Sequence, residues 1–372
     1  MILRKIKISE LTALTLSAEY ALWKQLPISP ARAISQSLNP DAQPDDIALI
    51  IALDDLSSEL IGFIGALPSV AQSPELSRVA WVTNWWVSGN HRGKGIAQTL
   101  LNSLLEVWGN VLCFQDLTLP TLKIIEKKNL FQTIQKQGVV VYIRTGLVNR
   151  LKKARYSSTK KQLFYRAIAH SGFLWLIDQM GNFTLFFPQQ IWTRSINSPK
   201  PKVISTPSLQ DFEFIKANST GNFHVPRPEE FEMSPWLVKP SPEMRFLSDK
   251  YPYSSFACSF SSFWLRWEND GQINALLFVT LREGVLKTQY VYCNDEFAKI
   301  LPGALLSYCF ENLKADTLMT AQDFLTDFYI SGRLPVLKKR KFTRYLAVSK
   351  DVMSHFEKET LFQDGEGDYK FT

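Results

Sequence analysis

The sequence predicts an α/β protein (an α+β mixed sheet) in which two tandem domains each place helices against a central mixed β-sheet. Three observations lead to this prediction. An apolar strand runs through a glycine-containing turn into a Leu-rich amphipathic helix within residues 82–105. The order of strands and helices before residue 145 recurs after residue 261. The length of 372 residues exceeds what one core of ordinary size supports.

The first domain is expected at residues 1–146. Residues 1–7 alternate as a short strand, and residues 11–25 have helical periodicity. A second helix follows, with Ser29 at its N-cap and Pro30 at its first position. The remaining expected elements are a hairpin of strands 47–53 and 60–67, a strand at 79–87, a helix to about residue 108, a strand at 110–115, a short helix at 120–128 and a final hairpin at 131–144.

A basic segment at 147–161 separates this domain from the next. It contains six Lys or Arg residues and no acidic residue, and so accounts for most of the formal charge of +7. We interpret it as a solvated linker, with a nucleic-acid or anionic-surface patch as the alternative. Because no RNA-recognition or zinc-finger motif accompanies it, nucleic acid is not expected to be a partner.

The second domain is expected at residues 162–350 and is followed by a C-terminal tail at 351–372. A Pro- and aromatic-rich insert at 221–253 has little periodicity and is either the wall of a substrate site or an ordinary ordered surface loop. The expected elements are a hairpin of strands 261–268 and 272–282 across Asp270-Gly271, a strand at 285–293, a helix at 297–313, a strand at 317–321, a short helix at 323–329 and a strand pair at 336–349.

The turn Arg92-Gly93-Lys94-Gly95-Ile96-Ala97 carries the main chemical signal. Its two glycines let the backbone turn tightly and approach an anion without a Cβ in the way. The first amides of the following helix have no intrahelical acceptor, and the positive end of the helix dipole points in the same direction. Arg92 and Lys94 add positive charge. The turn therefore predicts a phosphate-binding cradle.

Neither a nucleotide-triphosphatase loop nor a dinucleotide-binding fingerprint is present in the sequence. The turn instead resembles the Arg/Gln-x-x-Gly-x-Gly/Ala acyl-CoA pyrophosphate loop of the GCN5-related N-acetyltransferases (GNAT), and the element order to about residue 145 resembles theirs. The resemblance implies an N-acetyltransferase that uses acetyl-CoA as cosubstrate. We add Thr118, a polar residue that is expected to approach the thioester sulfur of acetyl-CoA. The implied cofactor-binding residues are Trp86, Val87, Ser88, Arg92, Gly93, Lys94, Gly95, Ile96, Ala97 and Thr118.

The sequence departs from the family pattern where an acid and a base are usual. Thr83 and Asn84 stand where many relatives carry Glu or Asp, and Ile125 stands where the acid Tyr is usual. The candidate catalytic residues are therefore Asn84, by ordering a water, and Ser88 and Tyr142, by approaching the sulfur. Each has an ordinary structural role as its alternative. An active enzyme that relies on thioester polarisation, and a binding module that has lost its chemistry, both remain open.

The second domain resembles the first without its cradle. At the matching junction the chain reads Asn294-Asp295-Glu296-Phe297-Ala298-Lys299, which has no glycine pair and places two carboxylates against a pyrophosphate. This predicts a degenerate GNAT-like domain that shapes the acceptor cleft. The layout resembles two-domain relatives such as N-myristoyltransferases and the mycobacterial-type enhanced-survival acetyltransferases.

Other sequence features bound the partners. Four cysteines form no C-x-x-C pair, so we expect free thiols and no metal site. No basic-then-apolar leader and no apolar run of about 20 residues is found, which favours a cytoplasmic location and no membrane partner. The acceptor is expected to be a small-molecule or protein amine, and the protein a monomer or homodimer.

Overall fold

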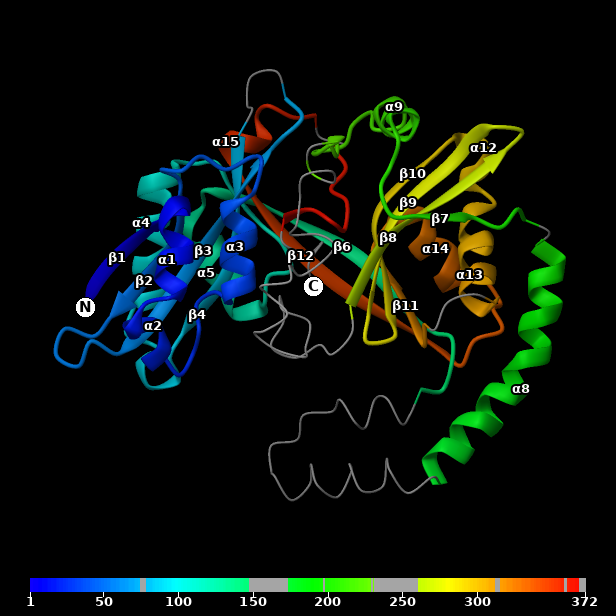
Figure 1. Cartoon of the computed structure of the whole chain (residues 1–372), viewed down its shortest axis with the longest axis horizontal. Coiled ribbons are helices and arrows are strands. Elements are labelled where there is room, and N and C mark those ends of the chain that lie inside the picture. The colour runs from blue at the N-terminus through cyan, green and yellow to red at the C-terminus, as the bar shows by residue number, and fades with distance from the viewer. Residues whose placement is uncertain are drawn as a thin grey trace. The chain divides into compact units, whose positions relative to one another are not determined.

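The computed structural model describes residues 1–73, 78–146, 173–196, 198–228, 230, 260–311, 315–357 and 360–367 (Figure 1). These residues form two compact units. Unit 1 comprises Met1–Lys136, Ile204–Trp264 and Thr343–Thr372, and unit 2 comprises Gln137–Val203 and Leu265–Phe342. The expected linker at 147–161 and the insert beyond residue 230 lie outside the described residues.

Unit 1 contains a mixed sheet, as predicted. Its only parallel pairing among the described strands joins β4 to β5, where Ala80 faces Leu112. The other pairings are antiparallel. In order across the sheet, the strands are β1 (Ile2–Lys7), β2 (Ile47–Leu53), β3 (Leu60–Val70), β4 (Arg78–Val87), β5 (Leu112–Phe114) and β12 (Lys338–Ser349).

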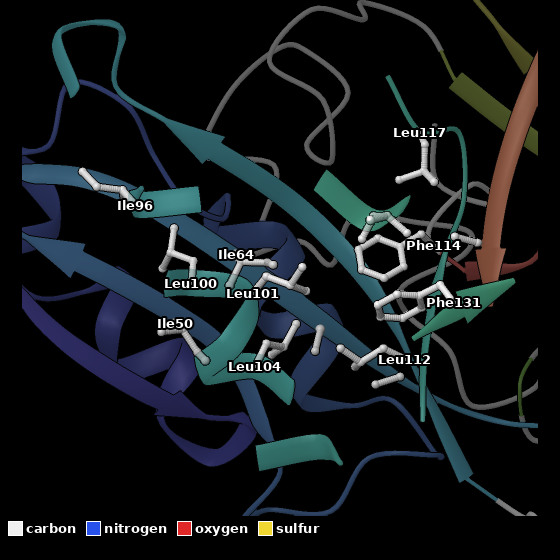
Figure 2. Packing of buried hydrophobic residues seen from close by; sticks show 14 of the residues in the cluster. Ile50, Ile64, Ile96, Leu100, Leu101, Leu104, Leu112, Phe114, Leu117 and Phe131 are labelled. Carbon is white, nitrogen blue, oxygen red and sulfur yellow. The ribbon is translucent and has the colours of Figure 1, made fainter. Parts of the chain in front are cut away.

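Helices cover both faces of this sheet (Figure 1). On one face, α1 (Leu11–Thr15), α2 (Ala18–Leu22) and α3 (Pro30–Ser37) pack on alternate residues of β2 such as Leu49 and Ile51. On the other face, α4 (Ile96–Trp108) packs on Ile50 and Ala52, and α5 (Leu119–Lys128) contributes Leu122 and Ile125 to the same core. Figure 2 shows Leu100, Leu101 and Leu104 of α4 in this second core. The period-2 alternation of β2 therefore divides the unit into two apolar cores.

The expected helix at 11–25 is two short helices. Ser17 is extended, with φ −73° and ψ 150°, and its hydroxyl accepts a hydrogen bond from the Tyr20 amide. It is the N-cap of α2, so the chain restarts a helix there instead of continuing one. A 3-10 turn, η1 (Ile8–Glu10), precedes α1. Two further helices of unit 1 are α9 (Leu209–Ala217) and α15 (Lys350–Met353).

Unit 2 has the sheet order β6 (Phe131–Tyr142), β11 (Thr317–Thr320), β10 (Val285–Cys293), β9 (Gln272–Arg282), β8 (Phe260–Asn269) and β7 (Lys202–Ile204). The predicted Asp270-Gly271 turn is confirmed, because both residues have positive φ, 49° and 79°. The expected helix at 297–313 is divided into α12 (Asp295–Ala298) and α13 (Leu301–Glu311), and Pro302 lies in the first turn of α13. The other helices are α8 (Phe173–Ile196) and α14 (Asp323–Ser331).

The predicted recurrence of elements is confirmed. In unit 1 the order β3-β4-α4-β5-α5 contains the parallel pair β4–β5, and in unit 2 the order β9-β10-α13-β11-α14 contains the parallel pair β10–β11. Each half thus builds a mixed sheet around one strand–helix–strand crossover.

The two final strands correct the sequence analysis. The hairpins expected at 131–144 and 336–349 are single long strands, β6 and β12. Tyr142 of β6 pairs with Thr317 of unit 2, and Ala347 of β12 pairs with Phe114 of unit 1. Each of these strands is divided between the units, because residues 131–136 of β6 and 343–349 of β12 belong to unit 1 and the rest of both strands to unit 2. The predicted domain boundaries at residues 146 and 350 divide the chain into consecutive segments, and they stay predictions. Each compact unit, by contrast, consists of several stretches that alternate along the sequence.

Candidate functional site

A bulge in β4 shapes the site. Thr83 faces Gly65 on β3 and Trp86 faces Phe63, so Asn84 and Trp85 together oppose the single residue Ile64. Asn84 has φ +47°, in the left-handed region where Asn is among the tolerated residues. The extra residue turns the end of the strand, and the Trp86 ring stacks on Phe63 with centroids 5.2 Å apart.

Beyond the bulge, β4 separates from β5. Their pairing ends at Val82 opposite Phe114, because β5 has only three residues. In the described part of the chain, β4 from Trp85 to Val87 therefore has no β5 neighbour. A cavity of about 390 Å³ opens here, lined by Trp85, Trp86, Val87, Arg92, Ala97, Thr118, Pro120, Thr121 and Ile124.

The glycine turn adjoins this cavity. Gly93 and Gly95 both have φ +81°, and Gly95 is the N-cap of α4. A Cβ added to Gly95 would meet no atom within 4 Å, so the space above the turn is open. A second cavity of about 380 Å³ lies over it, and it shares Val87, Arg92, Ala97, Pro120 and Ile124 with the first. The turn and the strand gap thus form one continuous groove.

Electrostatically, the turn suits an anion. The amides of Ile96, Ala97 and Gln98 begin α4 and have no acceptor in the described residues. Arg92 and Lys94 are exposed, and neither pairs with a carboxylate in the part of the chain that the structure describes. Gly62 on β3 holds the helix close, since a Cβ there would lie 3.1 Å from side-chain atoms of both Ile96 and Leu100.

Most predicted cofactor residues lie together. Trp86, Val87, Arg92, Gly93, Gly95, Ile96, Ala97 and Thr118 line one or both cavities. Lys94 is on the same turn. Ser88 follows β4, and its amide donates to the Ile61 carbonyl at 2.9 Å, so this amide is engaged by β3. Thr118 is the N-cap of α5, and its hydroxyl lies 2.8 Å from that of Thr121.

Asn84 is held on the side of the sheet that carries α3. Its Oδ1 accepts a hydrogen bond from Arg32 Nη1 at 3.1 Å, and its Nδ2 donates to the Pro27 carbonyl at 3.1 Å. Both ends of the amide thus tie the bulge to the start of α3. This is the structural alternative for Asn84, and its catalytic role stays a prediction.

The other two acid–base expectations differ in outcome. Ile125 is fully buried in the α4–α5 core, so an apolar side chain fills the place where relatives carry Tyr. Tyr142 lies on β6 in unit 2 and lines neither of the two cavities. Its predicted approach to the sulfur stays untested.

Several lining residues escaped the sequence analysis. Pro120 and Ile124 are one helical turn apart on α5 and line both cavities. The sequence shows that these two residues are four positions apart and so lie on one side of the helix. It does not show that this side faces the cavities. The sequence analysis names Trp86 and not its neighbour Trp85. The bulge that turns the Trp85 side chain toward the cavity has no sequence signature. Its buried Nε1 has no partner among the described residues.

The corresponding junction of unit 2 is closed. Asn294 caps α12, and its Oδ1 accepts from the Phe297 amide at 2.8 Å. Its Nδ2 donates to Asn274 Oδ1 at 3.1 Å. Asp295 and Glu296 occupy the first turn. The amide that could bind a phosphate is already satisfied, and two carboxylates stand beside it.

The described residues contain no group of three His, Cys, Asp or Glu side chains that could hold a metal ion. Cys113 and Cys309 are free and fully buried, and burial raises the pKa of the Cys309 thiol to about 12. Cys293 is also free, and burial raises its pKa to about 11. Cys258 lies outside the described residues.

Comparison with known proteins agrees with this geometry. Residues 12–119 match the acetyltransferase (GNAT) family. Saccharomyces cerevisiae N-myristoyltransferase with bound myristoyl-CoA and inhibitors is similar over 99% of this chain and 84% of its own, with 10% identity and a TM-score of 0.51. A GCN5-related N-acetyltransferase from Kribbella flavida is similar over 93% and 70%, with 11% identity and a TM-score of 0.46. None of the curated proteins matches the chain.

At such identities the structural likeness concerns the fold alone, whereas the family match covers β4, the glycine turn and α4. The chain therefore carries an acetyltransferase domain of the GNAT family at residues 12–119.

Proposed function

We propose that the protein is an acetyl-CoA-dependent N-acetyltransferase in which an amine attacks the thioester directly in a ternary complex. The observation that carries this proposal is the continuous groove from the open glycine turn to the gap between β4 and β5. One end offers helix amides and cations to a pyrophosphate, and the other offers an unpaired strand edge to an extended amide-containing arm. The acyl-CoA thioester supplies the activated acetyl group.

In this proposal the chain acts mainly by positioning. The helix amides and Arg92 bind the phosphates, and the free edge of β4 from Trp85 to Val87 orients the arm. Backbone amides at this edge polarise the thioester carbonyl, as in an oxyanion hole. Fixing the reacting groups in place lowers the barrier without a dedicated side-chain acid. Asn84 keeps the bulge in shape through Pro27 and Arg32.

We expect single removals of the candidate polar groups to have modest effects. Asn84→Ala, Ser88→Ala and Tyr142→Phe should each lower kcat by less than the roughly 10²- to 10⁴-fold typical of losing a general acid or base. Steady-state kinetics, with CoA affinity and thermal melting as controls, measure this. A loss of about a thousandfold for one variant with both controls intact would identify that residue as the missing acid or base.

We also expect one acetyl-CoA per chain. The unit 2 junction has its Phe297 amide capped by Asn294 and two acidic side chains in the first turn. Native mass spectrometry across a range of acetyl-CoA concentrations counts the bound molecules. Two equivalent sites per chain would contradict the degenerate second domain.

The function itself is tested by following CoA release from acetyl-CoA with a panel of small amines and amine-bearing peptides. Turnover that needs both the amine and acetyl-CoA supports the enzyme. Tight acetyl-CoA binding with no turnover on any amine would favour the second candidate, a regulatory or assembly module. Two observations favour that candidate: an apolar Ile125 is buried where relatives carry Tyr, and both ends of the Asn84 amide are hydrogen-bonded. The cytoplasmic location and the amine acceptor stay predictions.

A further inference from the structure

Helix α8 packs on the rest of unit 2 through a side that includes several polar residues. Asn182 Oδ1 accepts from the Thr145 amide at 3.0 Å, and Gln189 Nε2 donates to the carbonyls of Ile143 and Pro335 at 3.0 and 3.1 Å. Asp178 and Gln189 are both buried. These contacts fix which side of the helix faces the rest of unit 2 (Figure 1).

The opposite side of α8 is apolar and exposed. The packed side also carries apolar residues, since Ile196 lies against Gly303 of α13. Helix α8 is therefore apolar on both sides, whereas surface helices of globular proteins normally turn a polar side to the solvent. A hollow of about 570 Å³ adjoins this side, and its described lining consists of the apolar Met180, Phe183 and Phe186 and the polar Gln179, Asn182 and Thr184. An apolar surface of this extent marks an interaction site. The side chains that are more than half exposed include Trp175, Leu176, Met180, Phe183, Phe187 and Ile191.

A basic segment adjoins the packed side of α8, behind its exposed apolar face. The only acidic residue of α8 is Asp178, which is on the packed side. Gln189 ties the helix to Pro335, within the sequence RLPVLKKRK at 333–341, which has five Lys or Arg and no acid. Arg333, Lys338 and Arg340 are exposed.

We propose that the exposed face of α8 binds the surface of an anionic lipid membrane. A helix that offers Trp, Phe, Leu and Met on one side, with Lys and Arg beside it, lies in the interface plane with its apolar side among the acyl chains. The basic residues add attraction to anionic headgroups. A second copy of this chain fits less well, because it would bring like charges together.

This inference goes beyond the sequence-based expectation of no membrane partner, which concerns a segment that spans the bilayer. Among the described residues, no helix is long and apolar enough to cross a bilayer. An interfacial helix does not need that length of apolar sequence, because only one of its sides enters the lipid.

The test is co-sedimentation of the full-length protein with vesicles of phosphatidylcholine alone or mixed with phosphatidylglycerol. We expect binding to the anionic vesicles that weakens as salt is raised. The double variant Phe183→Ser, Phe187→Ser should reduce the partition coefficient at least about tenfold, because two large apolar side chains no longer enter the lipid. Leu56→Ser, at a side chain that is 97% exposed in unit 1, is the matched control and should bind like the wild type.

A second variant addresses the charges. Lys338→Gln, Arg340→Gln and Lys341→Gln together should weaken binding to anionic vesicles at least about fivefold and reduce its salt dependence. Circular dichroism melting confirms that each variant is folded. The proposal is overturned if the wild type binds no anionic vesicles, or if both variants bind as the wild type does. It is also overturned if light scattering shows a dimer that the Phe183→Ser, Phe187→Ser variant loses, since the partner is then a second copy.

Discussion

Replacing Gly95 by Asp is expected to weaken acetyl-CoA binding by more than about tenfold, or ~1.4 kcal/mol. The new carboxylate would stand at the N-cap of α4, beside the amides proposed to bind the pyrophosphate. Two like charges would then share the space that is open above the turn. The backbone at φ +81° also disfavours a Cβ, so the turn itself is strained. Isothermal titration calorimetry with acetyl-CoA measures the change.

Two controls separate charge from backbone strain. Gly95→Ala keeps the positive-φ cost but adds no charge, and its Cβ meets no atom within 4 Å. It should lose less affinity than Gly95→Asp. Gly221→Asp adds the same side chain at φ +78° in open space elsewhere in unit 1 and should leave acetyl-CoA affinity unchanged. Unchanged affinity of Gly95→Asp would remove the glycine turn from the binding site.

The sequence predicts this turn well because its signals are local. Two glycines at positive φ, a helix start and an adjacent strand depend on neighbouring residues only. The order of strands and helices along the chain follows from local signals of the same kind. The continuous apolar run of β2, IALIIAL, for example, indicates a strand that is buried on both faces. Asp270-Gly271 predicted its hairpin from two residues.

The non-local features could not be predicted. β6 and β12 pair with partners far along the chain, and this pairing uses backbone hydrogen bonds that are common to all residues. The bulge at Asn84 needed knowledge of the β3 register. The orientation of α8 depends on the long-range hydrogen bonds of Asn182 and Gln189. A period of 3.6 residues identifies two sides of a helix without saying which one is covered.

The largest change in stability is expected when a buried acid of unit 1, Glu366, is replaced. Residues 360–367 lie against the sheet, where Gln115 Nε2 donates to the Asp364 carbonyl at 3.1 Å and a Cβ on Gly367 would lie 3.2 Å from the Trp81 ring. Glu366 is almost fully buried. One carboxyl oxygen accepts from the Gln363 amide at 2.9 Å, and the other has no partner among the described residues.

Burial raises the pKa of Glu366 to about 8, against its ordinary value of 4.5. The Gln363 amide, His224 and Lys136 lower the pKa, and Asp364 raises it, but burial is the largest cause. Between these two pH values the folded state holds a proton that the unfolded state has released. The stability contributed by the protonated form is therefore complete below about pH 4.5 and is lost as pH rises to about 8.

Glu366→Gln is expected to remove this pH dependence. Glutamine resembles the protonated acid in shape and can still accept from the Gln363 amide, so near pH 5 the variant and the wild type should unfold at similar denaturant concentrations. Above about pH 8 the variant should be more stable by a few kcal/mol, a large part of a typical unfolding free energy of about 5–15 kcal/mol. Urea unfolding at both pH values, compared as variant minus wild type, cancels the titration of other groups. A difference that is the same at both pH values would mean that Glu366 is ionised throughout, and that its buried carboxylate is compensated by His224 and Lys136 instead.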